Sequence, residues 1–172
     1  QEMLQNGLTE LAEYGADITI KDWSHDTIEQ LQHDNLAVEQ HGANAVELDD
    51  HFYEGIEEYD IIITQFAPIG KKLIEKAKKL QYIGVLRGGV ENVDQEAAAK
   101  QGIKVVNTPG RNARAVAEFT VGLILAETRN IARSHGAMKK HLWLKEFPNK
   151  EAIPELGGQV VGLVGMGNIG QY

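Results

Sequence analysis

The sequence predicts an α/β fold built on a parallel sheet. Short β-branched segments alternate along the chain with segments of helical pattern, and the helical segments in the middle of the chain are roughly ten residues long. A glycine-rich turn directly follows the last of the β-branched segments. Strands separated by helices of this length form βαβ units with right-handed crossovers, so the strands are expected to run parallel. In such sheets ligands bind where strands end, which directs attention to the loops after each strand.

The first third of the chain is expected to form two helices and one strand. Four apolar residues at helical spacing predict a helix that ends at Gly15: Met3, Leu4, Leu8 and Leu11. Residues 16–23 alternate between apolar and polar side chains, which predicts a strand. Residues 26–40 are polar and predicted to be helical, and the acidic residues 42–59 are predicted to form helix and loop.

The middle of the chain is expected to supply the sheet. Three short segments are predicted strands: 60–64, 82–86 and 104–107. The first consists largely of isoleucine, which suits a strand buried on both faces. Helices are predicted at 69–80 and 94–101, the second with Asp94 as its N-cap and Gly102 as its stop.

The last third is expected to contain one long helix and one strand. Residues 108–110 break the chain, and a helix is predicted from Asn112 to His135. Its apolar residues occupy more than one face, so we expect it to be buried between layers or domains, with Gly122 admitting another backbone. Residues 160–164 are predicted to form a strand that leads into the glycine-rich turn.

Composition excludes several classes of function. The 172 residues include no cysteine, which excludes thiol catalysis, disulfides and cysteine-ligated metal centres. The formal net charge of -8 argues against nucleic acid or an anionic membrane as a partner. No apolar run is long enough to cross a bilayer. The absence of cysteine fits a reducing compartment, and we expect a cytoplasmic protein.

The glycine-rich turn has the spacing of a dinucleotide-binding loop. Gly165 would make the tight turn, Gly167 would let the backbone approach a pyrophosphate, and Gly170 would let the following helix pack on the strand. Without a ligand the same residues would form a simple strand-to-helix turn, but the strand predicted before them favours dinucleotide binding. The acidic residue that contacts the ribose would fall after Tyr172, so NAD and NADP both remain open.

A second glycine pair lies in the segment RGGVENVD, between a predicted strand and a predicted helix. Gly88 and Gly89 would expose backbone N–H groups able to hold a small carboxylate, and Arg87 adds a positive charge. The alternative at this point is a flexible turn in which Arg87 pairs with an acidic residue at the surface.

Three segments together resemble one family. They are RGGVENVD, GIKVVNTPGRNARAVAEFTVGLIL and ELGGQVVGLVGMGNIG, in that order. They resemble the D-isomer-specific 2-hydroxyacid dehydrogenases, which include phosphoglycerate, glycerate and D-lactate dehydrogenases. The resemblance is to the N-terminal part of such an enzyme. It implies a flavodoxin-like substrate domain over residues 1–110 without its first strand, and a crossing helix with the start of a Rossmann domain over residues 111–172.

The resemblance also implies site residues. Substrate binding falls on one loop: Arg87, Gly88, Gly89 and Val90. Cofactor binding falls on six positions: Val116, Gly165, Gly167, Asn168, Ile169 and Gly170. The loop glycines and Val90 would give N–H groups to the substrate carboxylate. Val116 would lie against the nicotinamide end of the cofactor, and Asn168 and Ile169 would bind its pyrophosphate.

The function implied is hydride transfer between C4 of a nicotinamide and C2 of a 2-hydroxy or 2-oxo acid. The family's catalytic arginine, glutamate and histidine all follow the glycine-rich turn, so no catalytic residue is assigned here and the chain alone is expected to be inactive. Six histidines are left without a catalytic or metal role: His25, His33, His41, His51, His135 and His141. The segment Asp49-Asp50-His51 is expected to be a solvated acidic loop, not a metal site.

Two other functions remain open at this point. One is a non-catalytic, NAD-sensing regulator of corepressor type on the same fold, and the other is a stand-alone flavodoxin-like binding module. RGGVENVD is shorter than the common form of this loop in the family, which leaves the identity of the 2-hydroxy acid open. The resemblance also implies a homodimer, often through the crossing helix, although the apolar residues of this helix fit burial within the chain equally well.

Overall fold

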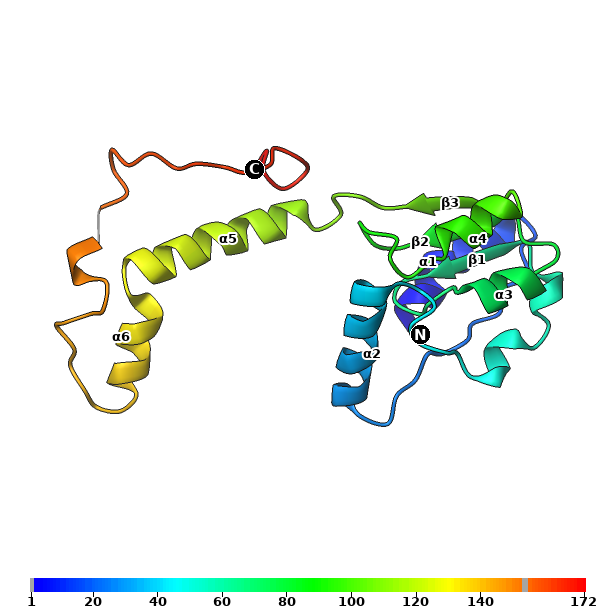
Figure 1. Ribbon diagram of the computed structural model, residues 1–172, viewed down its shortest axis with the longest axis horizontal. Helices are drawn as coiled ribbons and strands as arrows, with labels where there is room; N and C mark the ends of the chain where they lie inside the picture. The colour runs from blue at the N-terminus through cyan, green and yellow to red at the C-terminus, as the bar shows by residue number, and fades with distance from the viewer. Residues whose placement is uncertain (1, 153–154) are drawn as a thin grey trace. The chain divides into compact units, whose positions relative to one another are not determined.

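The computed structural model describes residues 2–152 and 155–172. Its chain divides into two compact units, one up to Thr108 and one from Pro109 onward. The first unit is built on a parallel sheet of three strands, β1 (Ile61–Thr64), β2 (Tyr82–Val85) and β3 (Lys104–Asn107), in the order β1-β2-β3 (Figure 1). These are the three strands predicted for the middle of the chain, and the α/β class is confirmed.

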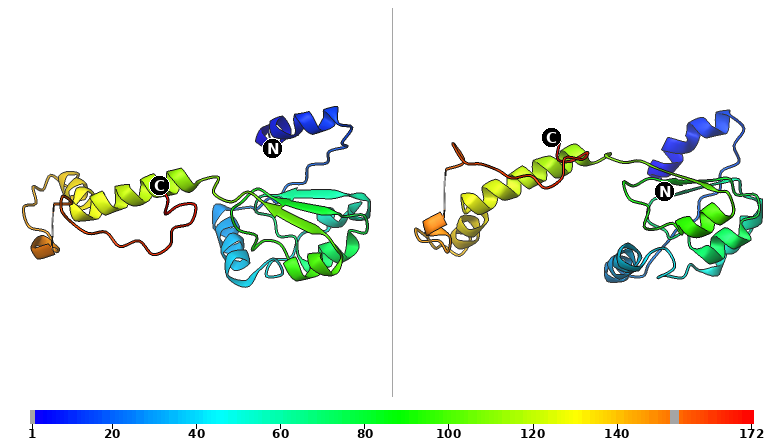
Figure 2. Two further views of the ribbon diagram at one scale, coloured as in Figure 1. Left: turned by 90° about the horizontal axis from the view of Figure 1, so that it is seen from above. Right: turned by 45° about the horizontal axis from the view of Figure 1, so that its top comes forward.

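The same unit contains the following helices: α1 (Glu2–Glu13), α2 (Ile28–His41), α3 (Lys71–Lys76), α4 (Gln95–Lys100) and the short 3-10 helices η1 (Asp50–Tyr53) and η2 (Ile56–Glu58). Figure 2 shows α3 and α4 together on one face of the sheet. On that face Ile83 and Val85 of β2 are almost fully buried against Ile74 of α3 and Ala98 of α4. The core of this unit therefore lies between the sheet and these two helices.

The other face of the sheet remains open. Ile61 and Ile63 of β1 are 58% and 41% exposed, and Val106 of β3 is 57% exposed. The prediction that the first strand is buried on both faces is therefore wrong for this structure. The reason is that both α3 and α4 pack on one face, which leaves alternate side chains of every strand uncovered.

Residues 16–23, predicted as a strand, form no regular secondary structure. This segment is tied to the unit by a side chain instead of a backbone ladder. The Lys21 ammonium donates to the carbonyl oxygens of His51 at 2.8 Å and Glu54 at 2.6 Å. Alternation of apolar and polar residues is typical of a strand but is not sufficient to form it, because a strand also needs a neighbouring strand with which to share hydrogen bonds.

Side chains fix the starts of two helices at the sheet. The Asp94 carboxylate accepts from the Ala97 backbone N–H at 2.9 Å, so Asp94 is the N-cap of α4, as predicted. The Asn44 side chain donates to Asp94 at 2.7 Å and accepts from the backbone N–H of Lys71, the first residue of α3, at 2.8 Å. Helix α3 is shorter than predicted at both ends: the backbone of Ile69 pairs with that of Val93 before the helix begins, and Ala77 leaves the helical conformation with ψ 79°.

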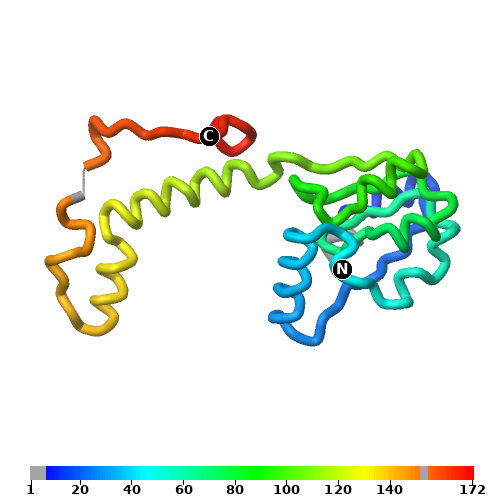
Figure 3. Tube along the Cα trace, in the orientation of Figure 1, coloured from blue at the N-terminus to red at the C-terminus, as the bar shows by residue number. Residues whose placement is uncertain are grey.

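The second unit contains α5 (Ala113–Thr128), α6 (Ile131–Met138) and the 3-10 helix η3 (Lys150–Ala152). The single helix predicted from 112 to 135 is thus wrong, since the chain breaks between α5 and α6. Asn130 causes the break, because it adopts a left-handed conformation with φ 54°. Its side-chain oxygen accepts from Arg133 at 2.8 Å, and the residue is only 1% exposed. The path of the chain through this turn can be followed in Figure 3.

Helix α5 is largely exposed in this structure, contrary to the predicted burial. Phe119 is 67% exposed and Leu123 is 54% exposed, and no heavy atom approaches the open side of Gly122 within 4 Å among the described residues. Residues 160–164, predicted as a strand, form none. The described part of this unit contains no strand with which they could pair.

None of the helices in the described ranges has the length and apolar character needed to span a bilayer.

Candidate functional site

The loop from Arg87 to Val90 leaves the carboxyl end of β2, beside the end of β3. Its first residues are bound to the end of β3. The backbone N–H of Thr108 donates to the Arg87 carbonyl at 3.0 Å, and the Asn107 side chain donates to the Gly88 carbonyl at 2.6 Å. The loop therefore starts from a fixed position at the edge of the sheet where ligands bind in parallel α/β folds.

The far end of the loop is bound to the segment after β1. The backbone N–H of Ile69 donates to the Asn92 carbonyl at 2.7 Å, and that of Asp94 donates to the Ile69 carbonyl at 3.0 Å. The fully buried Asn92 side chain also donates to the Ala67 carbonyl at 3.3 Å. Both ends of the loop are thus hydrogen-bonded to neighbouring segments, which is typical of an ordered turn and not of a flexible one.

Arg87 is oriented by two neighbours. Its guanidinium Nη2 lies 2.8 Å from a carboxylate oxygen of Glu39 on α2, and its Cζ lies 5.1 Å from the centre of the Phe66 ring. The Arg87 side chain is 18% exposed. The sequence left open that Arg87 pairs with an acidic residue, and the structure contains such a pair.

The two loop glycines have different surroundings. A Cβ atom added to Gly88 would meet nothing within 4 Å, so its backbone is accessible from that side. A Cβ atom added to Gly89 would overlap the carboxylate of Glu91, which folds back against the loop. The four residues predicted to bind substrate thus lie in one turn, with one cation and two carboxylates around it.

The glycine-rich turn is tightly folded. Gly165 has φ 100°, a conformation that favours glycine, and a Cβ atom added to Gly170 would lie 3.1 Å from the Met166 Cα and would overlap the Gly165 carbonyl oxygen. Gly167 has open space on the corresponding side. Two of the three glycines are therefore required by the backbone of the turn, and the third leaves room for a ligand to approach.

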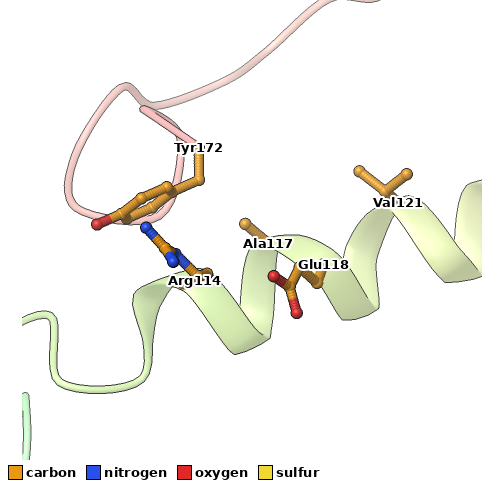
Figure 4. Close-up of a pocket in the computed structure, with 5 residues that line it drawn as sticks. All are labelled: Arg114, Ala117, Glu118, Val121 and Tyr172. Atoms are coloured by element: carbon orange, nitrogen blue, oxygen red, sulfur yellow. The ribbon is translucent and has the colours of Figure 1, made fainter.

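This turn lies beside the start of α5. A Cβ atom added to Gly110 would lie 3.2 Å from the Asn168 side chain, so Asn168 packs on the open face of that glycine. The Arg114 guanidinium lies 5.5 Å from the centre of the Tyr172 ring (Figure 4). These two residues border an open hollow of about 330 Å³ whose other lining residues are Ala117, Glu118 and Val121.

None of the six predicted cofactor residues is among those that line this hollow. Val116 is half-buried in the first turn of α5 and is not among the residues that line it. Ile169 accepts from the backbone N–H of Tyr172 at 3.1 Å within the turn. The hollow is open and carries one positive and one negative side chain, Arg114 and Glu118, at its wall.

Two aspartates in the first unit have lowered pKa values. Hydrogen bonds from the Ala97 backbone and from Asn44 lower the pKa of Asp94. Hydrogen bonding to His33 lowers the pKa of Asp34, which also lies 3.1 Å from the His25 ring nitrogen. Neither Asp34 nor Asp94 lies in the loop from Arg87 to Val90. Across the described residues, no three histidine or acidic side chains gather as metal ligands would.

A family model for the catalytic domain of the D-isomer specific 2-hydroxyacid dehydrogenases matches residues 18–165. The chain belongs to this family. D-3-phosphoglycerate dehydrogenase of Methanocaldococcus jannaschii is 39% identical over 124 residues, which are 71% of this chain and 23% of that protein. Hydroxypyruvate reductase of Thermotoga maritima is 39% identical over 123 residues, which are 71% of this chain and 39% of that protein. The chain thus spans well under half the length of these two relatives.

Two solved structures have a similar fold. The TT0316 protein of Thermus thermophilus superimposes with a TM-score of 0.63 and is 27% identical, over 96% of this chain and 47% of that one. Formate dehydrogenase of Granulicella m. superimposes with a TM-score of 0.56 and is 31% identical, over 74% of this chain and 35% of that one.

Sequence reasoning missed the residues that hold the candidate sites in place. Asn107 could have been found, because it ends a predicted strand beside the loop at Gly88. Glu39 could not, since it lies 48 residues from Arg87 and no pattern links them. Arg114 and Tyr172 likewise meet only through the fold.

Proposed function

We propose that the protein carrying this chain is an NAD(P)-dependent oxidoreductase that transfers a hydride between nicotinamide C4 and C2 of a small 2-hydroxy or 2-oxo acid. Family membership supports this, as do the names of the two relatives that are 39% identical. Within the chain, residues 1–110 would bind substrate, and residues 111–172 would form the crossing helix and the beginning of the dinucleotide-binding domain.

The observation that carries the proposal is the fixed loop after β2. Hydrogen bonds from Asn107 and Thr108 on one side, and between Ile69 and Asn92 on the other, attach the segment that contains the turn from Arg87 to Val90 to its neighbours. A turn with successive accessible N–H groups can bind a carboxylate without an ordering cost at the moment of binding. We assign the substrate carboxylate to the N–H groups of Gly88, Gly89 and Val90, with Arg87 at its side.

The glycine-rich turn fits a dinucleotide. Gly170 fills a position where any side chain would collide with the turn, and Gly167 is open to an approaching pyrophosphate. We assign the pyrophosphate to this turn together with Asn168 and Ile169, and the nicotinamide end to Val116. The bound nicotinamide supplies or accepts the hydride, while the residues of this chain bind and orient the two reactants.

We also propose that the protein is a cytoplasmic homodimer, with α5 contributing to the subunit contact. The support for the contact is the exposed apolar surface of α5, which includes Phe119 and Leu123. The support for the compartment is the absence of cysteine.

The test is an assay of the full gene product with NADH and with NADPH against a series of 2-oxo acids. The loss of absorbance by the reduced cofactor measures turnover. We expect turnover, and we expect the 172-residue chain alone to show none. Gly170→Ala should raise the KM for the cofactor several-fold, because the turn cannot hold a side chain there. Gly162→Ala is the matched control, since Gly162 is exposed and has open space. Failure to turn over any 2-oxo or 2-hydroxy acid would contradict the proposal.

A further inference from the structure

Glu39 pairs with Arg87 at the start of the loop from Arg87 to Val90. We propose that this residue determines substrate specificity: by pairing with Arg87, it disfavours 2-oxo and 2-hydroxy acids that carry a second negative charge. The inference rests on the proposed function, because it assumes that the loop from Arg87 to Val90 binds the substrate. Glu39 acts through Arg87 and needs no contact with the substrate itself.

The Arg87 guanidinium has a neighbour on each of two sides. The Arg87 guanidinium lies 2.8 Å from the Glu39 carboxylate on one side and 5.1 Å from the centre of the Phe66 ring on the other. Its side chain is 18% exposed, whereas that of Glu39 is 51% exposed. The guanidinium is thus held between a ring and a carboxylate, and its charge is already partly balanced before any substrate arrives.

Local helix stability does not account for an acidic residue at this position. Glu39 lies in the last turn of α2 (Ile28–His41), where the helix dipole presents its negative end and favours cations. The pairing with Arg87 is therefore the interaction that Glu39 makes in this position, and it joins α2 to the loop after β2.

A second carboxylate strengthens the effect. Glu91 folds against Gly89 in the same loop, so the turn carries the negative charges of Glu39 and Glu91 against the one positive charge of Arg87. The backbone N–H groups can still bind the C1 carboxylate of a substrate. A second anionic group on that substrate would find no uncompensated cation among these three side chains and would be repelled by the remaining negative charge.

The experiment compares two substrates of equal chain length that differ in one end group. 2-Oxopentanoate ends in a methyl group, and 2-oxoglutarate ends in a second carboxylate. The ratio of kcat/KM for 2-oxoglutarate to that for 2-oxopentanoate is measured in the full gene product and in its Glu39→Gln variant. We expect the substitution to raise this ratio roughly 3- to 10-fold, as expected for one charge removed several ångströms from an anion near a protein surface.

The change should appear in KM and not in kcat, because Glu39 affects binding and not the reacting atoms. It should also shrink as salt is raised from about 0.1 M to about 1 M, since salt screens charges at this distance. Glu29→Gln is the matched control. It removes the same charge from the same helix, but Glu29 lies ten residues earlier, about 15 Å along the helix axis. This control should leave the ratio unchanged.

An unchanged ratio in Glu39→Gln, or an equal change with both substrates, would overturn the inference and leave the proposed function standing. If the wild-type protein reduces no 2-oxo acid, the proposed function fails, and the inference is decided by binding alone. In that case both acids are titrated against the amide NMR signals of Gly88 and Gly89. A gain in the relative affinity for 2-oxoglutarate in Glu39→Gln would support the inference, and its absence would overturn it.

Discussion

The two units of the chain contain helices and apolar residues in similar measure, yet only the first has a substantial core. In the first unit Ile74 and Ile83 are completely buried between helices and sheet. In the second, Phe119 and Leu123 of α5 remain more than half exposed. The difference is the sheet. Paired strands offer a broad surface on which two helices can pack together, whereas α5 has no comparable surface within the described part of its unit.

The largest expected effect comes from emptying the core of the first unit. Ile83→Ala should lower the free energy of unfolding of that unit by about 2 to 5 kcal/mol, since it removes a fully buried side chain and leaves a cavity. Leu123→Ala in α5 should cost less than about 1 kcal/mol, because that side chain is 54% exposed. Urea unfolding followed by residue-specific amide signals measures both. Equal losses would show that α5 is as well packed as β2.

A middle-sized effect is expected at the N-cap of α4. Asp94→Ala should cost about 1 kcal/mol at neutral pH, because the carboxylate accepts from the Ala97 backbone N–H and from Asn44. These hydrogen bonds lower the pKa of Asp94 below its usual 3.8 in the folded chain. The ionised carboxylate thus stabilises the fold fully above that usual value, and this stabilisation is lost as the pH falls through the lowered pKa.

The difference in free energy of unfolding between wild type and Asp94→Ala should accordingly become smaller below about pH 4. Urea unfolding at a series of pH values from about 7 to about 2.5 measures this difference. Asp49→Ala serves as the control, since Asp49 precedes the 3-10 helix η1 and makes no side-chain cap hydrogen bond. A difference for Asp94→Ala that stays constant down to the lowest pH would contradict the assigned role of its carboxylate.

The smallest effect tests whether α5 is covered. Gly122 lies inside α5 with open space where a Cβ would be placed, so Gly122→Ala should stabilise this helix by about 0.5 to 1 kcal/mol. Gly102 ends α4 with φ 73°, so Gly102→Ala should instead destabilise the first unit by about 1 kcal/mol. Thermal unfolding of both variants measures the two changes in stability. Destabilisation by Gly122→Ala would mean that another backbone packs against this face, as the sequence predicts.

The sequence by itself determined the features that depend on neighbouring residues. The three strands of the sheet, the cap at Asp94 and the turn at Gly165–Gly170 all follow from patterns a few residues long. The family resemblance, which the family model now confirms, likewise rests on contiguous motifs. Such features are set by local backbone preferences and by side chains that form hydrogen bonds within their own segment. Both can be predicted from a few consecutive residues.

Only the tertiary structure decided the features that need a distant partner. Residues 16–23 and 160–164 have the composition of strands, but a strand exists only where another strand shares its hydrogen bonds. The break at Asn130 divided the helix predicted from 112 to 135, because this residue takes a left-handed conformation that its buried surroundings hold. The pairing of Glu39 with Arg87 joins residues 48 positions apart, and no periodicity links them. Contacts of this kind depend on where folding brings two surfaces together, which the order of residues nearby does not specify.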